Sequence, residues 1–231
     1  MKMKKYIVVT IKKWNIKNYH LFKPKKNKKW ILITNSKKLN FKYLKSIEPK
    51  YIFFPHWSKK VSKKIISNFR CICFHETNVP YGRGGSPIQN LIARGHKQTV
   101  ISAIRMTDKF DAGPVYLKKS LSLVGNAEQI YERASKTIFK MIKTIIKIEL
   151  KPKRQKGKVV IFKRRTMKQS IIPKNTKSLK KLFDHIRMLD AETYPRAFIK
   201  HGNLKILFNK AKISKKSIKA NVTIKINSNI K

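Results

Sequence analysis

The 231-residue chain is 41% hydrophobic, which is enough for one core of ordinary size with a small appendage. No run of 18 apolar residues occurs, so we expect no membrane-spanning helix and no membrane partner. The formal net charge of +47 makes nucleic acid an obvious partner, but only 10 of the 57 basic residues are arginine. Lysines spread along the whole chain indicate solvated faces and compositional drift more than a phosphate-binding patch, which favours arginine.

The first residues, MKMKKYIVVTIKKW, contain only a short apolar run and no small-residue cleavage site, so they predict a strand and not a signal peptide. Cys71 and Cys73 alternate around Ile72 and would share one face of a strand, where they are too constrained to form a disulfide. A lone C-x-C pair is also a weak metal signal. A reducing, cytoplasmic setting fits this cysteine usage best.

Short apolar segments alternate with helical patterns at the start of the chain. Strands are predicted at Lys5–Ile11, Trp30–Thr34, Tyr51–Phe54 and Cys71–His75. Helical spacing occurs at Leu39–Ile47 and Lys59–Phe69, although the first helix is poorly marked, and the segment near Pro24 is expected to be a loop. Continuous apolar strands separated by helices predict an α/β fold with a mostly parallel sheet flanked by helices.

The stretch GGSPIQNLIARG predicts a helix with clear signals at both ends. Ser86 is a natural N-cap, Pro87 suits the first helical position, and Gln89 is placed to complete a capping box. Gly95 supplies the stop at the C-terminal end.

Two predicted strands, Thr99–Met106 and Val115–Leu123, precede a long helix. Asn126 with Gln129 is expected to cap this helix. Its apolar stripe consists of Ile130, Ala134, Ile138, Met141, Ile142 and Ile145.

The basic stretch LKPKRQKGK predicts a break in the chain, so we expect a main domain over 1–150, a linker over 151–158 and a small accessory module over 159–231. The module is expected to contain a strand at Val159–Lys163, a helix at Ser178–Leu189 and strands at Leu204–Phe208 and Ile218–Ile226. The terminal basic tail is expected to be frayed.

His75 ends an apolar strand and directly precedes the glycine-rich stretch ETNVPYGRGGS. In open α/β sheets, ligands bind beyond the carboxyl ends of strands, so His75 is a candidate catalytic residue. A partly buried histidine bonded to the backbone is the alternative interpretation.

Acids are scarce in this chain, yet two of the ten, Asp108 and Asp111, lie in the loop MTDKFDAGPV between two predicted strands. This loop also leaves the end of a strand, so we expect Asp111 to approach His75 and orient its ring. Asp108 is expected to serve the turn through backbone hydrogen bonds.

The segment from Phe74 to Val115 resembles the signature of the 10-formyltetrahydrofolate-dependent formyltransferases. The matching residues are His75, Pro80, Arg83, Gly84, Pro87, Ile88, Gln89, Met106, Asp111 and Gly113. The resemblance is strong over Tyr51–Leu123 and weaker over Ile186–Ile199, which is similar to a segment of sugar and tRNA formyltransferases.

This resemblance implies a Rossmann-like formyltransferase fold, with the catalytic domain over 1–150 and 10-formyltetrahydrofolate as the co-substrate. A neutral amine would attack the formyl carbon, with His75 and Asp111 as the catalytic residues. His75 would stabilise the formyl oxygen and the leaving group, and Asp111 would take the proton of the amine. No metal is required, and no ligand set for one is apparent.

One residue departs from the family pattern. Cys73 occupies the position of the family asparagine, whose amide holds the formyl oxygen, and a thiol is only a weak hydrogen-bond donor. Loss of one such donor typically lowers turnover by about 10²–10³-fold. Thr77 or Asn78 are therefore candidates, with Cys73 itself, for positioning the formyl group.

The resemblance also implies binding residues. The folate-binding candidates are Phe54, Pro55, His56 and Trp57 of the stretch FFPHW, together with Asp108. The substrate-binding candidates are Tyr81, Arg83, Gly84, Gly85 and Gln89. An aromatic strand end and a tight turn that feeds a helix are the plainer interpretations of these two segments.

Three functions stay open from the sequence. Similarity around Tyr194 and the short remainder of 73 residues after residue 158 favour formyl transfer to the amine of a nucleotide-linked amino sugar. The first alternative is a methionyl-tRNA formyltransferase with tRNA as partner, although such enzymes carry a larger C-terminal barrel. The second alternative is a non-catalytic basic protein that retains the fold, and Cys73 is its best support.

Overall fold

A computed structural model describes residues 3–22, 28–192 and 194–226, which form two compact units. The first unit comprises Met1–Gly84, Thr99–Leu121 and Glu132–Ile161, and the second comprises Gly85–Gln98, Ser122–Tyr131 and Phe162–Lys231. Each unit is therefore built from separate stretches of the chain, whereas the domain boundaries predicted at 151–158 follow chain order and stay a prediction. The predicted loop near Pro24 and the predicted frayed tail lie outside the described residues.

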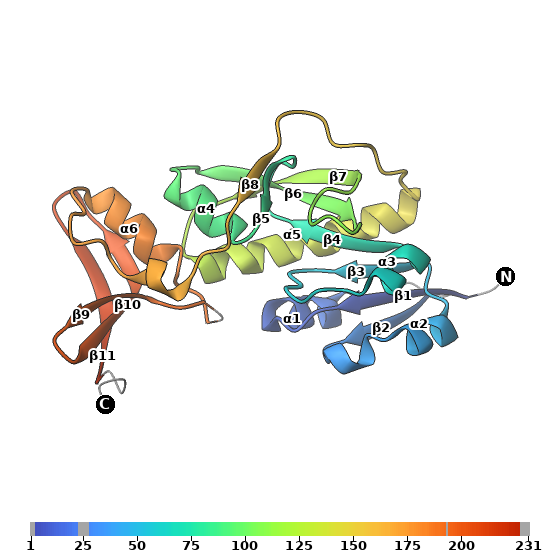
Figure 1. Ribbon diagram of the computed structural model, residues 1–231, viewed down its shortest axis with the longest axis horizontal. Coiled ribbons are helices and arrows are strands. Elements are labelled where there is room, and N and C mark those ends of the chain that lie inside the picture. The colour runs from blue at the N-terminus through green and yellow to red at the C-terminus, as the bar shows by residue number, and fades with distance from the viewer. Residues whose placement is uncertain (1–2, 23–27, 193, 227–231) are drawn as a thin grey trace. The chain divides into compact units, whose positions relative to one another are not determined.

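The first unit is organised around a six-stranded sheet (Figure 1). Its strands are β1 (Lys4–Val9), β2 (Lys28–Ile33), β3 (Tyr51–Phe54), β4 (Cys71–His75), β6 (Gln98–Arg105) and β7 (Val115–Ser122). They lie in the order β2-β1-β3-β4-β6-β7. The first four are mutually parallel, and β6 pairs antiparallel with β4. The predicted α/β fold with a mostly parallel sheet is confirmed, and the direction reverses beyond β4.

The inner strands of this sheet form the core. All four residues of β3 are buried, and Ile7, Val8 and Val9 of β1 are fully buried. Strands that are buried on both faces have continuous apolar runs instead of alternating polar residues, and such runs predict these strands from the sequence. β2 lies at the edge of the sheet, and only Ile33 at its end is buried.

Three short helices connect the first strands, namely α1 (Lys13–Leu21), α2 (Phe41–Ile47) and α3 (Lys63–Asn68). The predicted helices at Leu39–Ile47 and Lys59–Phe69 exist but begin later, because Asn40 and Ser62 act as N-caps through their side chains. The sequence pattern does not predict α1, whose N-cap residue Lys12 makes no capping bond with its side chain.

The long helix α5 (Ala127–Ile148) forms as its sequence predicts. Asn126 Oδ1 accepts from the Gln129 backbone N–H at 3.0 Å, and Gln129 Oε1 accepts from the Asn126 backbone N–H at 3.0 Å, which is a complete capping box. All six residues of the predicted apolar stripe are fully buried. The amphipathic pattern therefore places this helix correctly against the core.

The second unit contains α4 (Pro87–Ala93), the 3₁₀ helix η2 (Met167–Ser170), α6 (Leu179–Arg187) and an antiparallel sheet (Figure 1). The sheet has the order β11-β10-β9, from β9 (Ala197–His201), β10 (Leu204–Ile213) and β11 (Ile218–Ile226). The small C-terminal module of antiparallel strands agrees with the predicted fold class. β9 is not predicted by the sequence, which marks only the two strands after it.

Two segments differ from their interpretation in the sequence. Part of the segment for which a tight turn was the plainer interpretation is a strand, β5 (Tyr81–Gly84), which pairs with β8 (Val160–Phe162) in a two-stranded sheet. The capping box of α4 does not form, because Ser86 has a left-handed φ of 51° and makes no capping bond with its side chain. Its hydroxyl instead accepts from the Arg165 N–H at 3.1 Å and contacts the Tyr194 hydroxyl at 2.7 Å.

Within the part of the chain that the structure describes, no helix is both long and apolar enough to cross a membrane. Cys71 is buried and Cys73 is half-buried, and both are free thiols. Burial raises the pKa of the Cys71 thiol to about 12, so it remains protonated.

Ile142 and Ile148 of α5 offer a matched test of the core, since Ile142 is fully buried and Ile148 is 61% exposed. Ile142→Ala should lower the free energy of unfolding by about 2–5 kcal/mol, because a cavity replaces packed atoms. Urea denaturation measures this change. Ile148→Ala on the same helix should cost far less, and an equal loss for both variants would contradict the observed packing.

Candidate active site

β4 places His75 at the carboxyl end of the central part of the sheet. His75 is the last residue of the strand, pairs in register with Ser102 of β6, and is only 7% exposed. The Ser102 hydroxyl donates to the Thr77 carbonyl oxygen at 2.7 Å, which ties the chain just after His75 to β6. The imidazole therefore stands on rigid backbone, as a precise site requires.

Both nitrogens of the His75 ring face acceptors. Nε2 lies 2.7 Å from the Gly82 carbonyl oxygen, which can only accept, so this nitrogen carries a hydrogen. Nδ1 lies 3.6 Å from Asp111 Oδ2. Two residues distant in sequence are thus brought together as predicted, and an oxygen acceptor faces each nitrogen of the ring.

The loop between β6 and β7 holds Asp111 in a constrained conformation. Asp111 has a left-handed φ of 51°, which is uncommon for a residue with a side chain, and its carboxylate is half-buried. Asp111 Oδ2 accepts a hydrogen bond from the Gly84 backbone N–H at 3.0 Å. Gly113 is also required, because a Cβ there would collide with the carbonyl oxygen of Arg105.

Cys73 lies two residues before His75 on the same face of β4. Burial raises the pKa of its thiol, and the carboxylates of Asp111 and Glu76 raise it further, so the group stays a neutral thiol. The two other candidates for holding the formyl group are engaged elsewhere. The Thr77 hydroxyl donates to the Gly82 carbonyl at 3.2 Å, and the exposed Asn78 accepts from Lys118 Nζ at 2.5 Å.

A second imidazole–carboxylate pair, which the sequence analysis missed, lies beside the first. His56 Nε2 is 3.0 Å from Glu76 Oε1, and both side chains are 6% exposed. His56 Nδ1 lies 3.0 Å from Trp14 Nε1, a group that can only donate, so the hydrogen of the ring resides on Nε2 and faces Glu76. Asn15 Nδ2 also lies 3.0 Å from His56 Nδ1.

The pKa of Glu76 reflects this environment. Burial acts to raise it, but the electrostatic influence of His56 and its hydrogen bond outweigh burial, and His75 adds a smaller effect, so the pKa is lowered overall. Glu76 is therefore a buried carboxylate that stays charged. His56 follows the end of β3, and Glu76 follows the end of β4. The parallel pairing of these strands brings the two side chains together, and no pattern along the sequence predicts this contact.

The remaining folate-binding candidates differ in their surroundings. Phe54 and Pro55 are buried, and the Pro55 carbonyl accepts from Asn15 Nδ2 at 3.1 Å. The Trp57 ring packs on Phe54 with a centroid distance of 6.2 Å, and its buried Nε1 has no hydrogen-bond partner among the described residues. Asp108 is exposed and forms an ion pair with Lys63 at 3.2 Å.

The substrate-binding candidates divide between the two units. Tyr81, Arg83 and Gly84 belong to the first unit with His75 and Asp111. Gly85 and Gln89 belong to the second, where the Gln89 amide donates at 3.1 Å to the Tyr131 hydroxyl and at 3.1 Å to the Met188 carbonyl. Gln89 is fully buried in these contacts, which explains why it does not cap α4.

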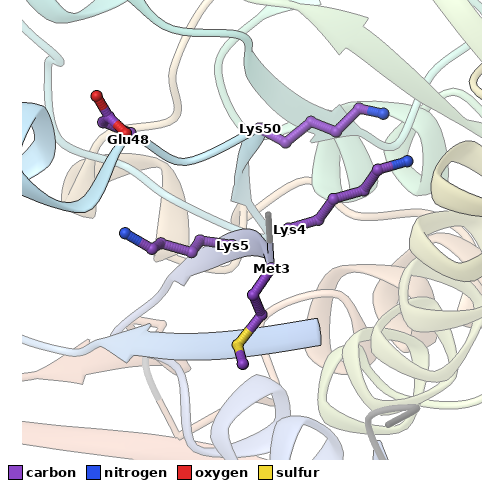
Figure 2. Close-up of a pocket in the computed structure, with 5 residues that line it drawn as sticks. All are labelled: Met3, Lys4, Lys5, Glu48 and Lys50. Atoms are coloured by element: carbon purple, nitrogen blue, oxygen red, sulfur yellow. The ribbon is translucent and has the colours of Figure 1, made fainter. Parts of the chain in front are cut away.

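A surface pocket lies at the amino ends of the parallel strands, whereas His75 lies at the carboxyl end of β4. Met3, Lys4, Lys5, Glu48 and Lys50 line it, and Figure 2 shows the Lys4 and Lys50 side chains running side by side. Both contact the Glu149 carboxylate, and these hydrogen bonds, first from Lys50 and then from Lys4, lower its pKa to about 2. Lys4 begins β1 and Lys50 directly precedes β3, so the pocket lies at the amino ends of these strands and is separate from the candidate active site.

Among the described residues, no group of three or more His, Cys, Asp or Glu side chains is arranged to hold a metal ion. The polar groups at the site are instead two imidazoles and two carboxylates in pairs. Such pairs can hold and move protons and can stabilise a developing negative charge.

Two protein-family models match the chain. The model described as "Formyl transferase" matches residues 13–145, which is more than half of the chain. The model described as "Methionyl-tRNA formyltransferase, C-terminal domain" matches residues 167–225.

Individual proteins of known name match the chain at different levels of sequence identity. A solved methionyl-tRNA formyltransferase from Clostridium thermocellum is 45% identical, with a TM-score of 0.93, and the match covers 96% of this chain and 99% of that one. A curated methionyl-tRNA formyltransferase of Thermotoga maritima is 25% identical over 74% of this chain and 56% of its own length. The chain thus spans about half the length of the curated relatives it matches.

A solved sugar N-formyltransferase from a Shewanella species matches at 14% identity with a TM-score of 0.67, covering 87% of this chain and 94% of that one. At this level of identity the likeness concerns the fold alone.

Glu76 provides a test of the buried second pair. Its pKa is lowered from the usual 4.5, so its stabilising effect is complete above pH 4.5 and is lost as the pH falls through the lower pKa of the folded state. Glu76→Gln should lower the free energy of unfolding at pH 7 by about 1–3 kcal/mol, because the buried hydrogen-bonded charge is removed. The same variant should lose less stability than the wild type between pH 5 and pH 3, measured by urea denaturation.

Glu132→Gln is the matched control, since Glu132 is an exposed residue of α5. It should leave unchanged both the free energy of unfolding at pH 7 and its loss between pH 5 and pH 3. An equal loss of unfolding free energy between pH 5 and pH 3 in the wild type and in Glu76→Gln would refute the buried charge of Glu76.

Proposed function

Because the chain belongs to the formyl transferase family, we propose that it transfers a formyl group from 10-formyltetrahydrofolate to the amino group of methionyl-tRNA. The observation that carries the activity is the contact between His75 and Asp111 at the end of β4. The acceptor is supported by the 45% identity to a methionyl-tRNA formyltransferase over nearly the whole of both chains.

The short C-terminal part favours an amino-sugar acceptor when it is considered from the sequence alone. That inference loses its basis, because a C-terminal domain model of methionyl-tRNA formyltransferases matches residues 167–225 of this chain. A short C-terminal part is therefore compatible with tRNA. The charge of +47 agrees with this partner but does not carry the proposal, since the lysines are spread over the whole chain.

The donor would supply the formyl carbon, to which the amine nitrogen bonds while the bond to the folate nitrogen breaks. His75 would hold positive charge next to the formyl oxygen as negative charge develops there. Gly82 fixes the ring through Nε2, while the 3.6 Å between Nδ1 and Asp111 exceeds a normal hydrogen bond. The Nδ1 hydrogen is therefore available to an incoming acceptor.

Asp111 would maintain the charge of His75 and accept the proton that the amine loses, directly or through one water. Its carboxylate is half-buried and held by the Gly84 N–H, so it is oriented without being sealed from substrate. His75 would pass a proton to the folate nitrogen as it leaves, so that the proton count balances across the transfer.

The end of β3 offers a fit for the folate. The Trp57 indole N–H is buried without a hydrogen-bond partner among the described residues, and it is thus available to an acceptor on the ligand. His56 serves a different purpose, because both its nitrogens face protein groups. We therefore expect His56 to shape this pocket through Glu76 and not to bond the folate directly.

Formyl transfer to methionyl-tRNA tests the proposal, with an amino-sugar nucleotide as the competing acceptor and 10-formyltetrahydrofolate in both reactions. We expect formylated methionyl-tRNA and no formylated sugar. His75→Ala and Asp111→Asn should each lower kcat by about 10²–10⁴-fold, because proton transfer and charge stabilisation are lost. The exposed His20→Ala should leave kcat unchanged.

Transfer to the sugar alone would move the acceptor back to the amino sugar. Folate binding without turnover on either acceptor would identify a non-catalytic protein that retains the fold. Wild-type rates in His75→Ala or Asp111→Asn would remove that residue from the mechanism, provided that thermal unfolding shows both variants to be folded.

Cys73→Asn tests the departure from the family pattern. An amide is a stronger donor than a thiol, so this variant should keep or raise kcat for formyl transfer. Cys73→Ala is the matched control and should behave like the wild type if the thiol contributes little. A collapse of kcat in Cys73→Asn alone would mean that the pocket is organised around the smaller thiol.

A further inference from the structure

The segment after α5, which the sequence presents as a linker, is fixed to the loop that carries Asp111. Lys153 and Val115 exchange two backbone hydrogen bonds of 2.7 and 2.9 Å and form an antiparallel bridge. Both residues belong to the first unit. The start of the supposed linker is therefore part of the same compact body as the candidate active site.

Gln155 makes the central contacts of this segment. Its Nε2 donates to the carbonyl oxygens of Asp111 and Gly113, each at 2.7 Å. Its Oε1 accepts from Arg83 Nε at 3.0 Å and from Arg83 Nη2 at 2.8 Å. A primary amide has two N–H donors and one oxygen with two lone pairs, so this half-buried side chain uses its full capacity.

These contacts act on the part of the backbone that aims the Asp111 carboxylate. Asp111 has a left-handed φ of 51°, a conformation that persists only when the surroundings hold it. Gln155 binds the carbonyl of Asp111 itself and the carbonyl two residues later, so it fixes the peptide planes on the C-terminal side of that conformation. The carboxylate at the other end of this arrangement faces Gly84 N–H and His75 Nδ1.

The same side chain joins β5 to the loop that carries Asp111. Arg83 lies on β5, next to Gly84, whose N–H bonds the Asp111 carboxylate. By holding Arg83 with one end and the Asp111 loop with the other, Gln155 closes a ring of contacts around the carboxylate.

We propose that Gln155 is a positioning residue that sets the Asp111 carboxylate against His75 through its hydrogen bonds to the Asp111 loop. Its catalytic consequence rests on the proposed formyl transfer, but the positioning itself is a property of the folded chain. Gln155 does not contact reacting atoms and acts through Asp111. A purely structural role would instead lower stability and leave the geometry of the carboxylate and kcat unchanged.

Two variants distinguish the donor contacts of the Gln155 amide from its acceptor contacts. Gln155→Met keeps the shape and removes all four hydrogen bonds. Gln155→Glu keeps an acceptor for Arg83 but removes both donors and places negative charge against two carbonyl oxygens. The control is Lys156→Met, because Lys156 is the exposed neighbour of Gln155.

The Gly84 amide reports the position of the carboxylate without any assay of activity, because its N–H donates to Asp111 Oδ2. In NMR spectra of the full chain, both Gln155 variants should shift the Gly84 amide resonance and speed its hydrogen exchange. The Gly85 amide, which donates to the Phe162 carbonyl at 2.8 Å, should change little and serves as an internal reference. Lys156→Met should leave both amides unchanged.

In the formylation assay, both Gln155 variants should lower kcat by about 10–100-fold, with little change in KM for the folate donor, since a small misplacement of Asp111 slows the chemical step. Full activity of Gln155→Glu with a loss in Gln155→Met would assign the effect to Arg83 and overturn the proposal. An unchanged Gly84 amide in both variants would also overturn it. If the wild type shows no formyl transfer, the proposed function fails, and the Gly84 amide alone decides the role of Gln155.

Discussion

The contact between the His75 imidazole and the Asp111 carboxylate is the interaction on which the candidate site depends. One partner stands at the end of the buried strand β4, and the other stands in the loop between β6, which runs antiparallel to β4, and β7. Each side of the contact is fixed by backbone groups, Gly82 O for the imidazole and Gly84 N–H for the carboxylate. Because both of these glycines belong to β5, one short strand contacts both catalytic candidates.

The polar groups around this contact form pairs that compensate each other's burial. A buried carboxylate without a partner would be costly, yet Glu76 faces His56 and Asp111 faces His75. The Trp14 and Asn15 side chains complete the second pair by engaging the far nitrogen of His56. The helix α1, which the sequence pattern does not predict, therefore supports the site through two buried residues at its start.

The scarce acids of the chain form specific ion pairs, whereas most of its many lysines do not belong to the candidate site. Several of the acids form ion pairs outside the candidate site: Glu149 pairs with two lysines, Asp184 with Arg187, and Asp190 with Arg196. The excess lysines lie on solvated faces, where they cost little and contribute little to any one contact. A chain can thus carry a charge of +47 while its core and its candidate site keep an ordinary balance of polar and apolar groups.

The sequence by itself determined the apolar strands, the capped and amphipathic helix α5, the family resemblance, and His75 and Asp111 as candidates, because each of these is written in local pattern or in spacing along the chain. Only the tertiary structure decided the pairing of Glu76 with His56, the use of Ser86 and Gln89 for packing in place of capping, and the contacts of Gln155. Those arrangements join residues that are far apart in sequence. Their partners are chosen by strand order and loop closure, which leave no periodic mark on the residues that they bring together.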